Sequence, residues 1–168
     1  VVVHALIALL KYSSRTVAIQ DSIQSMFQAD DSVPFVGTLH LLKSPDDDHR
    51  SAAIRFIAAY CERAIDVFEN FRFLLKHISQ VLGESKAQSR YIHRVAGLNA
   101  IATVLNYIRI NTGRVGGSSS RLSEEEVESL GELASTPVRC IIQDEDHLPT
   151  KAFAMNILGQ CSGAGGQC

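Results

Sequence analysis

The 168-residue sequence predicts one all-α domain, and three observations support that fold class. Apolar residues recur three and four positions apart along most of the chain, the spacing that places them on one face of a helix. No stretch of useful length alternates between apolar and polar residues, as a half-buried strand would. Hydrophobic residues make up 46% of the chain and charged residues 20%, which supports a packed core and excludes intrinsic disorder.

Seven to eight helices are predicted in chain order. Their ranges are about 4–12, 15–28, 33–43, 46–61, 64–82, 88–110, 123–143 and 149–161. The first two rest on apolar spacing alone. Ser32 can cap the third, with Pro34 in its first turn, and Ser44-Pro45 ends it. The acidic run 46–48 suits the positive N-terminal end of the fourth helix.

The later helices have clearer boundaries. Gly83 is expected to stop the fifth helix. Ser123 and Glu126, three residues apart, predict a capping box that opens the seventh. Pro137 is expected to kink or divide that helix, because proline lacks an N–H donor and clashes with the preceding turn. The residues expected on the buried face of the sixth helix are Tyr91, Val95, Leu98, Ile101, Ala102, Leu105 and Ile108.

The helical domain is expected to span residues 1–161. The Gly- and Ser-rich stretch at about 111–122 is predicted to be a flexible insert, and residues 162–168 a disordered tail. The chain starts at Val1 inside an apolar helix and stops in a Gly-rich segment. Both ends predict a fragment of a longer protein.

The sequence shows no signal peptide and no membrane-spanning segment, which predicts an intracellular protein, cytoplasmic or nuclear. The ten apolar residues at the start are too few to span a bilayer, and they lack the basic region and cleavage site of a signal peptide. The four cysteines are scattered and do not form the framework of a secreted disulfide-rich domain. We therefore expect no membrane contact.

The sequence repeats itself at an offset of 100 residues. Residues 52–61 align with residues 152–161 without a gap, and each segment follows an acidic run that ends in histidine. The matched pairs are Ala52/Ala152, Ile57/Ile157 and Cys61/Cys161. The repeated unit is a helix, a short acidic turn and an Ala-rich helix. Units of this kind hide their apolar faces by stacking on one another.

On these residues the chain resembles the armadillo/HEAT family of α-solenoids. The resemblance is strongest over residues 33–61, where a leucine-rich helix is followed by a Ser-Pro-Asp turn and an Ala-Ala helix. It returns in weaker form over residues 137–161. The resemblance implies an α-solenoid of three to four imperfect repeats.

The same resemblance implies a peptide groove. Armadillo repeats often place an Asn on the third helix, where its side chain binds the backbone of an extended peptide. Asn106 and Asn156, 50 residues apart, match that position. The importin-like groove adds a Trp one turn earlier, where this chain has Ala102 and Ala152, and it has no Trp at all. Nuclear localisation signals are therefore not the expected ligand, and simple solvation is the alternative for both Asn residues.

The sequence contains no motif for a metal, a cofactor or catalysis. The runs 46–49 and 144–147 combine acids with histidine but lack the ligand spacing of a zinc or calcium site, and an acidic helix N-terminus explains both. Neither a Gly-x-Ser-x-Gly elbow nor a His-Glu-x-x-His motif is present. Residues 113–117 lack the strand and the Lys of a phosphate-binding loop. We expect no metal, no cofactor, no small-molecule substrate and no enzymatic activity.

Basic residues concentrate in the middle of the chain, with an acidic segment after them. Arg55 and Arg109 belong to that basic group and join Asn106 and Asn156 as candidate partner-binding residues. Nucleic acid is the less favoured partner, because no aromatic residues interleave with the basic ones to stack on bases.

The predicted function is that of a noncatalytic scaffold or adaptor that binds other proteins through its helical repeats. Two alternatives remain open. The chain could be the regulatory helical region of a larger enzyme, or a HEAT-repeat protein associated with nucleic acid or chromosomes.

Overall fold

The computed structural model describes residues 4–5, 7–8, 33–63, 67–83, 91–112 and 122–163. These ranges are helical and contain no strand, so the all-α prediction is confirmed for them. The helices are α3 (Val33–His40), the 3₁₀ turn η2 (Leu41–Lys43), α4 (Asp47–Arg63), α5 (Val67–Gly83), α6 (Tyr91–Asn111), α7 (Glu124–Asp144) and α8 (Leu148–Gly163). The helix expected at 15–28, most of the insert and the end of the tail lie outside the described residues.

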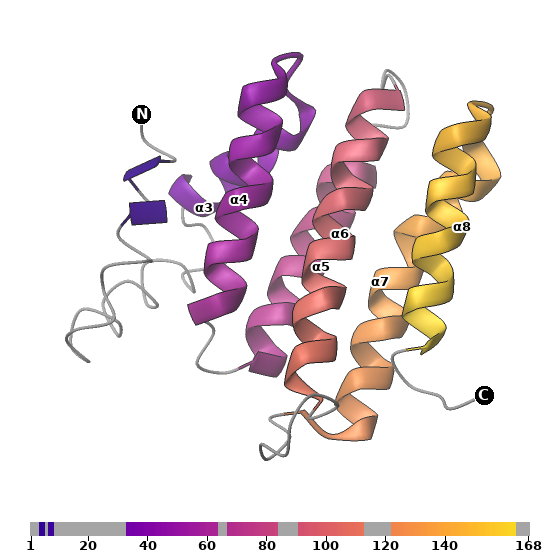
Figure 1. Cartoon of the computed structure of the whole chain (residues 1–168). Coiled ribbons are helices and arrows are strands. Elements are labelled where there is room, and N and C mark those ends of the chain that lie inside the picture. Colours follow the sequence, from indigo (N-terminus) through magenta and orange to yellow (C-terminus); the bar gives the residue numbers. More distant parts are fainter. Residues whose placement is uncertain are drawn as a thin grey trace.

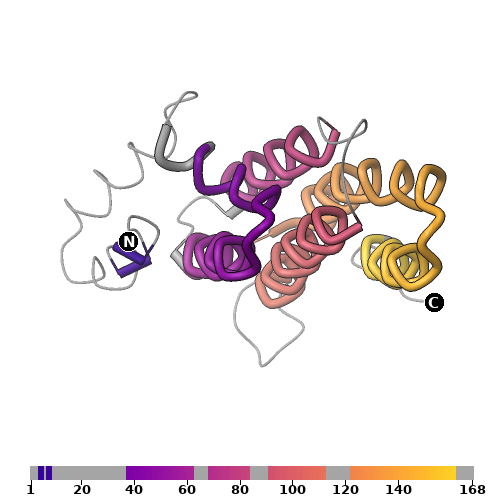
Figure 2. Tube along the Cα trace, turned by 90° about the horizontal axis from the view of Figure 1, so that it is seen from above, coloured from indigo at the N-terminus to yellow at the C-terminus, as the bar shows by residue number. Residues whose placement is uncertain are grey.

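The helices are arranged in two layers (Figure 1). One layer holds α4, α6 and α8, which run side by side in the same direction, with α6 in contact with both neighbours. The other layer holds α3, α5 and α7, which run the opposite way. Figure 2 shows the two rows from above. Cross-layer contacts join α5 to α6 and α7 to α8, so each helix packs mainly against its sequence neighbour and the next helix of its own layer.

Hydrogen bonds at the helix ends account for the boundaries. The backbone N–H of Ser44 donates to the Leu41 carbonyl at 3.0 Å and ends η2. Asp46 opens α4 by accepting a 2.8 Å bond from the N–H of Asp48. The capping box of α7 is confirmed: Ser123 accepts from the N–H of Glu126 at 3.3 Å, and its own N–H donates to Glu126 Oε2 at 2.7 Å.

The core lies between the two layers. Its largest fully buried side chains include Phe56, Phe71, Leu74, Ile78, Leu98, Ile101 and Ile108. The expected buried face of α6 is correct at Leu98, Ile101, Leu105 and Ile108 but wrong at Tyr91, which is 52% exposed. Tyr91 is the first residue of α6. It lies at the end of the helix, where the helices of the second layer do not cover it.

Pro137 does not divide the seventh helix, since α7 continues from Glu124 to Asp144. A proline inside a helix leaves one carbonyl without its N–H donor and costs about 3 kcal/mol. Pro137 is itself buried, and its neighbours Ala134 and Val138 are fully buried in the core. Burial of this helix face on both sides of the proline offsets the lost hydrogen bond, which the local sequence alone does not reveal.

The backbones of α7 and α8 approach closely at Gly131. A Cβ atom at this position would lie 2.9 Å from the carbonyl oxygen of Cys161. Only a glycine therefore allows this helix separation without a shift of one backbone relative to the other.

Candidate partner-binding surface

The outer side of the α4–α6–α8 layer is the best candidate for a functional surface. Because α6 is flanked by α4 and α8 and backed by α5, its exposed side chains lie on the one side that remains open. We call this side, with the exposed parts of α4 and α8 beside it, the open face. Its exposed residues include Ser51, Arg55, Glu62, Tyr91, Asn99, Asn106, Arg109, Ile110, Ala152, Asn156 and Gln160.

Asn106 and Asn156 are both exposed, on the adjacent parallel helices α6 and α8. Each amide oxygen accepts a bond from its own helix. Arg109 Nη2 donates to Asn106 at 3.1 Å, and Gln160 Nε2 donates to Asn156 at 2.9 Å. The amide NH₂ groups of both residues make no hydrogen bond within the described residues, so they are available to a ligand.

Arg55 is exposed on α4, the third helix of this layer, and pairs with no acid in the described ranges. The four candidate residues are therefore all exposed on one layer. Sequence reasoning missed Asn99, which is also exposed. Its signal is spacing: seven residues before Asn106 means two helical turns, so both lie on one face of α6.

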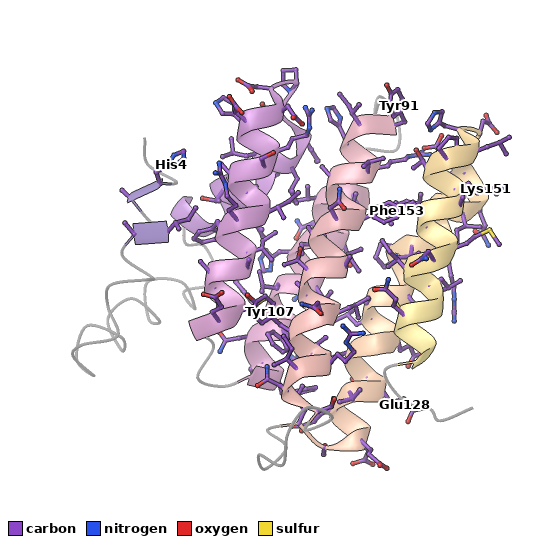
Figure 3. The ribbon with its side chains drawn as sticks, viewed as in Figure 1. His4, Tyr91, Tyr107, Glu128, Lys151 and Phe153 are labelled. Carbon is purple, nitrogen blue, oxygen red and sulfur yellow. The ribbon has the colours of Figure 1, made fainter. Side chains whose placement is uncertain are left out.

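Tyr107 connects α6 to α4 across this face. Its hydroxyl donates to Glu62 Oε1 at 2.9 Å, and Figure 3 shows the side chain between the two helices. Burial and this hydrogen bond to a carboxylate raise the pKa of Tyr107 to about 12. The phenol therefore stays neutral and keeps its donor role at physiological pH.

A groove of about 220 Å³ opens between the N-terminal halves of α4 and α6. Residues of these two helices alone line it, so it opens away from the second layer. The lining residues are Asp47, Arg50, Ser51, Ile54, Tyr91, Ile92, Val95, Ala96 and Asn99. We call this feature the α4–α6 groove.

A second cavity of about 220 Å³ lies on the other layer, between the end of α5 and α7. Arg94 and Asp144 supply its main polar groups. Arg94 Nη1 already binds Glu145 Oε2 at 3.0 Å and the Asp144 carbonyl at 3.2 Å. The Arg94 cation of this cavity is therefore already engaged in an ion pair within the chain.

Glu145 joins the start of α8 to α6. Burial tends to raise its pKa, but hydrogen bonds from the His147 N–H at 2.9 Å and from Arg94 outweigh burial and lower it. The ring of His147 stacks on Tyr91 at a centroid distance of 4.7 Å, and its Nδ1 lies 2.8 Å from Thr150 Oγ1. The side chains of Glu145 and His147 are therefore engaged by other residues of the same chain.

Two kinds of reactive group, a metal cluster and an ionised thiol, were sought among the described residues. No three His, Cys, Asp or Glu side chains there lie close enough together to bind a metal ion. Burial raises the pKa of Cys61 strongly and that of Cys161 to about 11, so neither thiol is a thiolate at neutral pH.

Comparison of the chain with protein-family models, with curated proteins and with solved structures found no match in any of the three. No helix among the described residues has the length and apolar content needed to span a membrane.

Proposed function

We propose that the chain is a noncatalytic protein-interaction module, built from helical repeats of the armadillo/HEAT type, that binds an extended segment of a partner protein along the open face. The observation that supports this most directly is the exposure of Asn106 and Asn156 on adjacent parallel helices of one layer. Their amide groups carry the donors that a peptide carbonyl requires.

The spacing of the helices suits an extended chain. Packed helices lie about 8–10 Å apart, and an extended chain advances about 3.3 Å per residue. Amide groups on α6 and α8 can therefore meet backbone groups about three residues apart. Asn99, two turns before Asn106, adds a further amide group to the same face.

The order of elements supports the repeat assignment. The pairs α3–α4, α5–α6 and α7–α8 each place one helix in the second layer and the next in the open-face layer. Stacked helix pairs of this kind bury a continuous core and leave an extended binding surface. The three described cysteines are free, which suits the reducing cytoplasm or nucleus.

The test is affinity capture from cell extract followed by direct titration of the captured partner. The bait is compared with Asn106→Ala/Asn156→Ala and with a matched double variant on the opposite layer, Lys76→Ala/Glu128→Ala, since both control residues are exposed. We expect the first variant to weaken the partner's affinity at least tenfold and the control to leave it unchanged. Circular dichroism confirms that each variant is folded. Equal affinity of all three proteins for every captured partner would refute the role of the open face.

A further inference from the structure

We propose that the α4–α6 groove takes one apolar side chain of the partner segment, and that Asp47 at its edge selects a lysine or arginine next to that side chain. This inference rests on the proposed function, because it specifies what the bound segment contains. It concerns residues that the Asn106/Asn156 pair does not include.

The size of the groove fits a single side chain. Sites that bury a drug-sized ligand have about 300–1,000 Å³, whereas the groove has about 220 Å³. Its wall is apolar and partly accessible: Ile54, Ile92 and Val95 are half-buried, and Ala96 is buried below them. An apolar side chain placed there would remove these surfaces from water, which favours binding.

The edge of the groove can bind a peptide backbone. Ser51 and Asn99 are exposed, on α4 and α6 respectively, and both line the groove. Their side chains make no hydrogen bond within the described ranges. A hydroxyl and an amide together offer donors and acceptors to the main chain on both sides of an inserted side chain.

The charge around the groove favours a cation. Asp46, Asp47 and Asp48 are all exposed at its upper end. Arg50 pairs with Asp47 at 2.9 Å, but the Arg50 side chain is only 11% exposed, and its guanidinium also donates to the Ser44 carbonyl at 2.6 Å. Arg55, exposed one turn after Ser51, is the other cation on this part of α4, so two cations stand against three exposed carboxylates and the local charge is negative by one. Charge complementarity selects a segment with lysine or arginine beside its apolar residue.

The test uses three defined probes: N-acetyl-Leu-Lys-amide, N-acetyl-Leu-Glu-amide and N-acetyl-Ala-Lys-amide. Each is titrated into the full chain with labelled Ile methyl groups, and the methyl signals of Ile54 and Ile92 are followed by NMR. We expect saturable shifts with the Leu-Lys probe and at least fivefold weaker binding of the other two. Equal binding of all three, or shifts confined to other Ile residues, would overturn the proposal.

Two variants examine the groove itself. Ser51→Trp should fill it from an exposed position and abolish the shifts, while Asp47→Asn should remove the preference for Leu-Lys over Leu-Glu. Asp48→Asn is the matched control, because Asp48 is exposed on the same first turn but does not line the groove. If Asp48→Asn removes the preference as fully as Asp47→Asn does, the assignment to Asp47 is wrong.

The outcomes separate the groove from the proposed function. Partner capture that depends on Asn106 and Asn156, without binding of the Leu-Lys probe, rejects the groove and leaves the proposed function intact. If the Leu-Lys probe binds but partner capture is unchanged by Asn106→Ala/Asn156→Ala, the groove is supported and the role of the two amides is rejected. If sedimentation shows that a second copy of the chain occupies the groove, as a dimer that Ser51→Trp dissociates, the peptide assignment is rejected.

Discussion

Helices α4 and α8 contain the two segments that repeat at an offset of 100 residues, yet their surroundings differ. Both lie in the open-face layer and run in the same direction. At two matched pairs the burial agrees, since Ile57, Ile157, Cys61 and Cys161 are all buried. At another aligned position it does not: Phe56 is fully buried in α4, whereas its counterpart Asn156 is exposed in α8.

The difference follows from position in the array. Helix α4 packs against η2 and α5 as well as α6, while α8 packs against α7 and α6 within the described residues. The repeated sequence therefore specifies a helix and the row of apolar residues that it buries in the core. The second buried face of α4 requires a neighbour that α8 lacks among these residues, and there the repeat diverges.

The turns that precede the two helices differ in the same way. Asp46 accepts from the N–H two residues later at 2.8 Å, and Glu145 does the same at 2.9 Å. Asp46 is exposed, whereas Glu145 also binds Arg94 of α6 and both partners are at most 15% exposed. One acidic turn caps a helix, and the other joins two helices.

The largest expected effect separates the matched pair Phe56 and Asn156. Phe56→Ala should lower the free energy of unfolding by about 3–5 kcal/mol, because it leaves a cavity in the core. Asn156→Ala should change it by less than about 0.5 kcal/mol, since the side chain is exposed. Urea denaturation measures both. Similar losses in the two variants would show that α4 and α8 are equally buried.

The two acidic turns should respond differently to neutralisation. Glu145→Gln should cost about 1.5–3 kcal/mol at pH 7, the range for hydrogen bonds to charged groups, and Asp46→Asn clearly less. The pKa of Glu145 lies below its usual 4.5, so its contribution is present above that pH and is lost as the pH falls through the folded-state pKa.

Thermal unfolding between pH 7 and pH 3 checks this. The wild type should lose stability below about pH 4.5, and Glu145→Gln should lose less over the same interval. Identical pH curves would mean that the ion pair with Arg94 contributes nothing.

A smaller effect is expected where α8 meets α7. Gly131→Ala should destabilise the protein by about 1–3 kcal/mol, because the new methyl group would force the Cys161 carbonyl away. Gly83→Ala is the matched control, since a Cβ there meets no atom of the described residues within 4 Å. A loss in the control as large as that in Gly131→Ala would assign the cost to backbone effects instead of close approach.

The smallest effect is expected at the matched pair Arg55 and Met155, which are both exposed. Met155→Arg copies the α4 residue into α8 and should change the free energy of unfolding by less than about 0.5 kcal/mol. Calorimetry of the variant beside the wild type checks this. A loss above 1 kcal/mol would indicate that Met155, 60% exposed in the structure, is covered by a contact in solution.

Much of the architecture follows from local sequence signals. Helical spacing, the capping residues Ser123 and Glu126, and Gly83 place the helix ends within a few residues of those observed. The continuity of α7 through Pro137 and the exposure of Tyr91 depend on packing between layers, which no local pattern contains. For the candidate surface, the exposure of Asn106 and Asn156 agrees with the prediction. The α4–α6 groove was not predictable, because it exists only once residues about 45 positions apart lie side by side.

The neighbour-only packing of the helices has a consequence for how the chain folds. Helices α4 and α8 make no extensive contact with each other, and most helix–helix contacts join elements close in sequence. Chains rich in such local contacts close short loops first and fold fast, because little loop entropy is lost before contacts form. Local unfolding can also begin at one end of the helical array and leave the helices at the other end folded. Backbone amides of α8 should therefore exchange with solvent sooner than those of α6, whose neighbours lie on both sides.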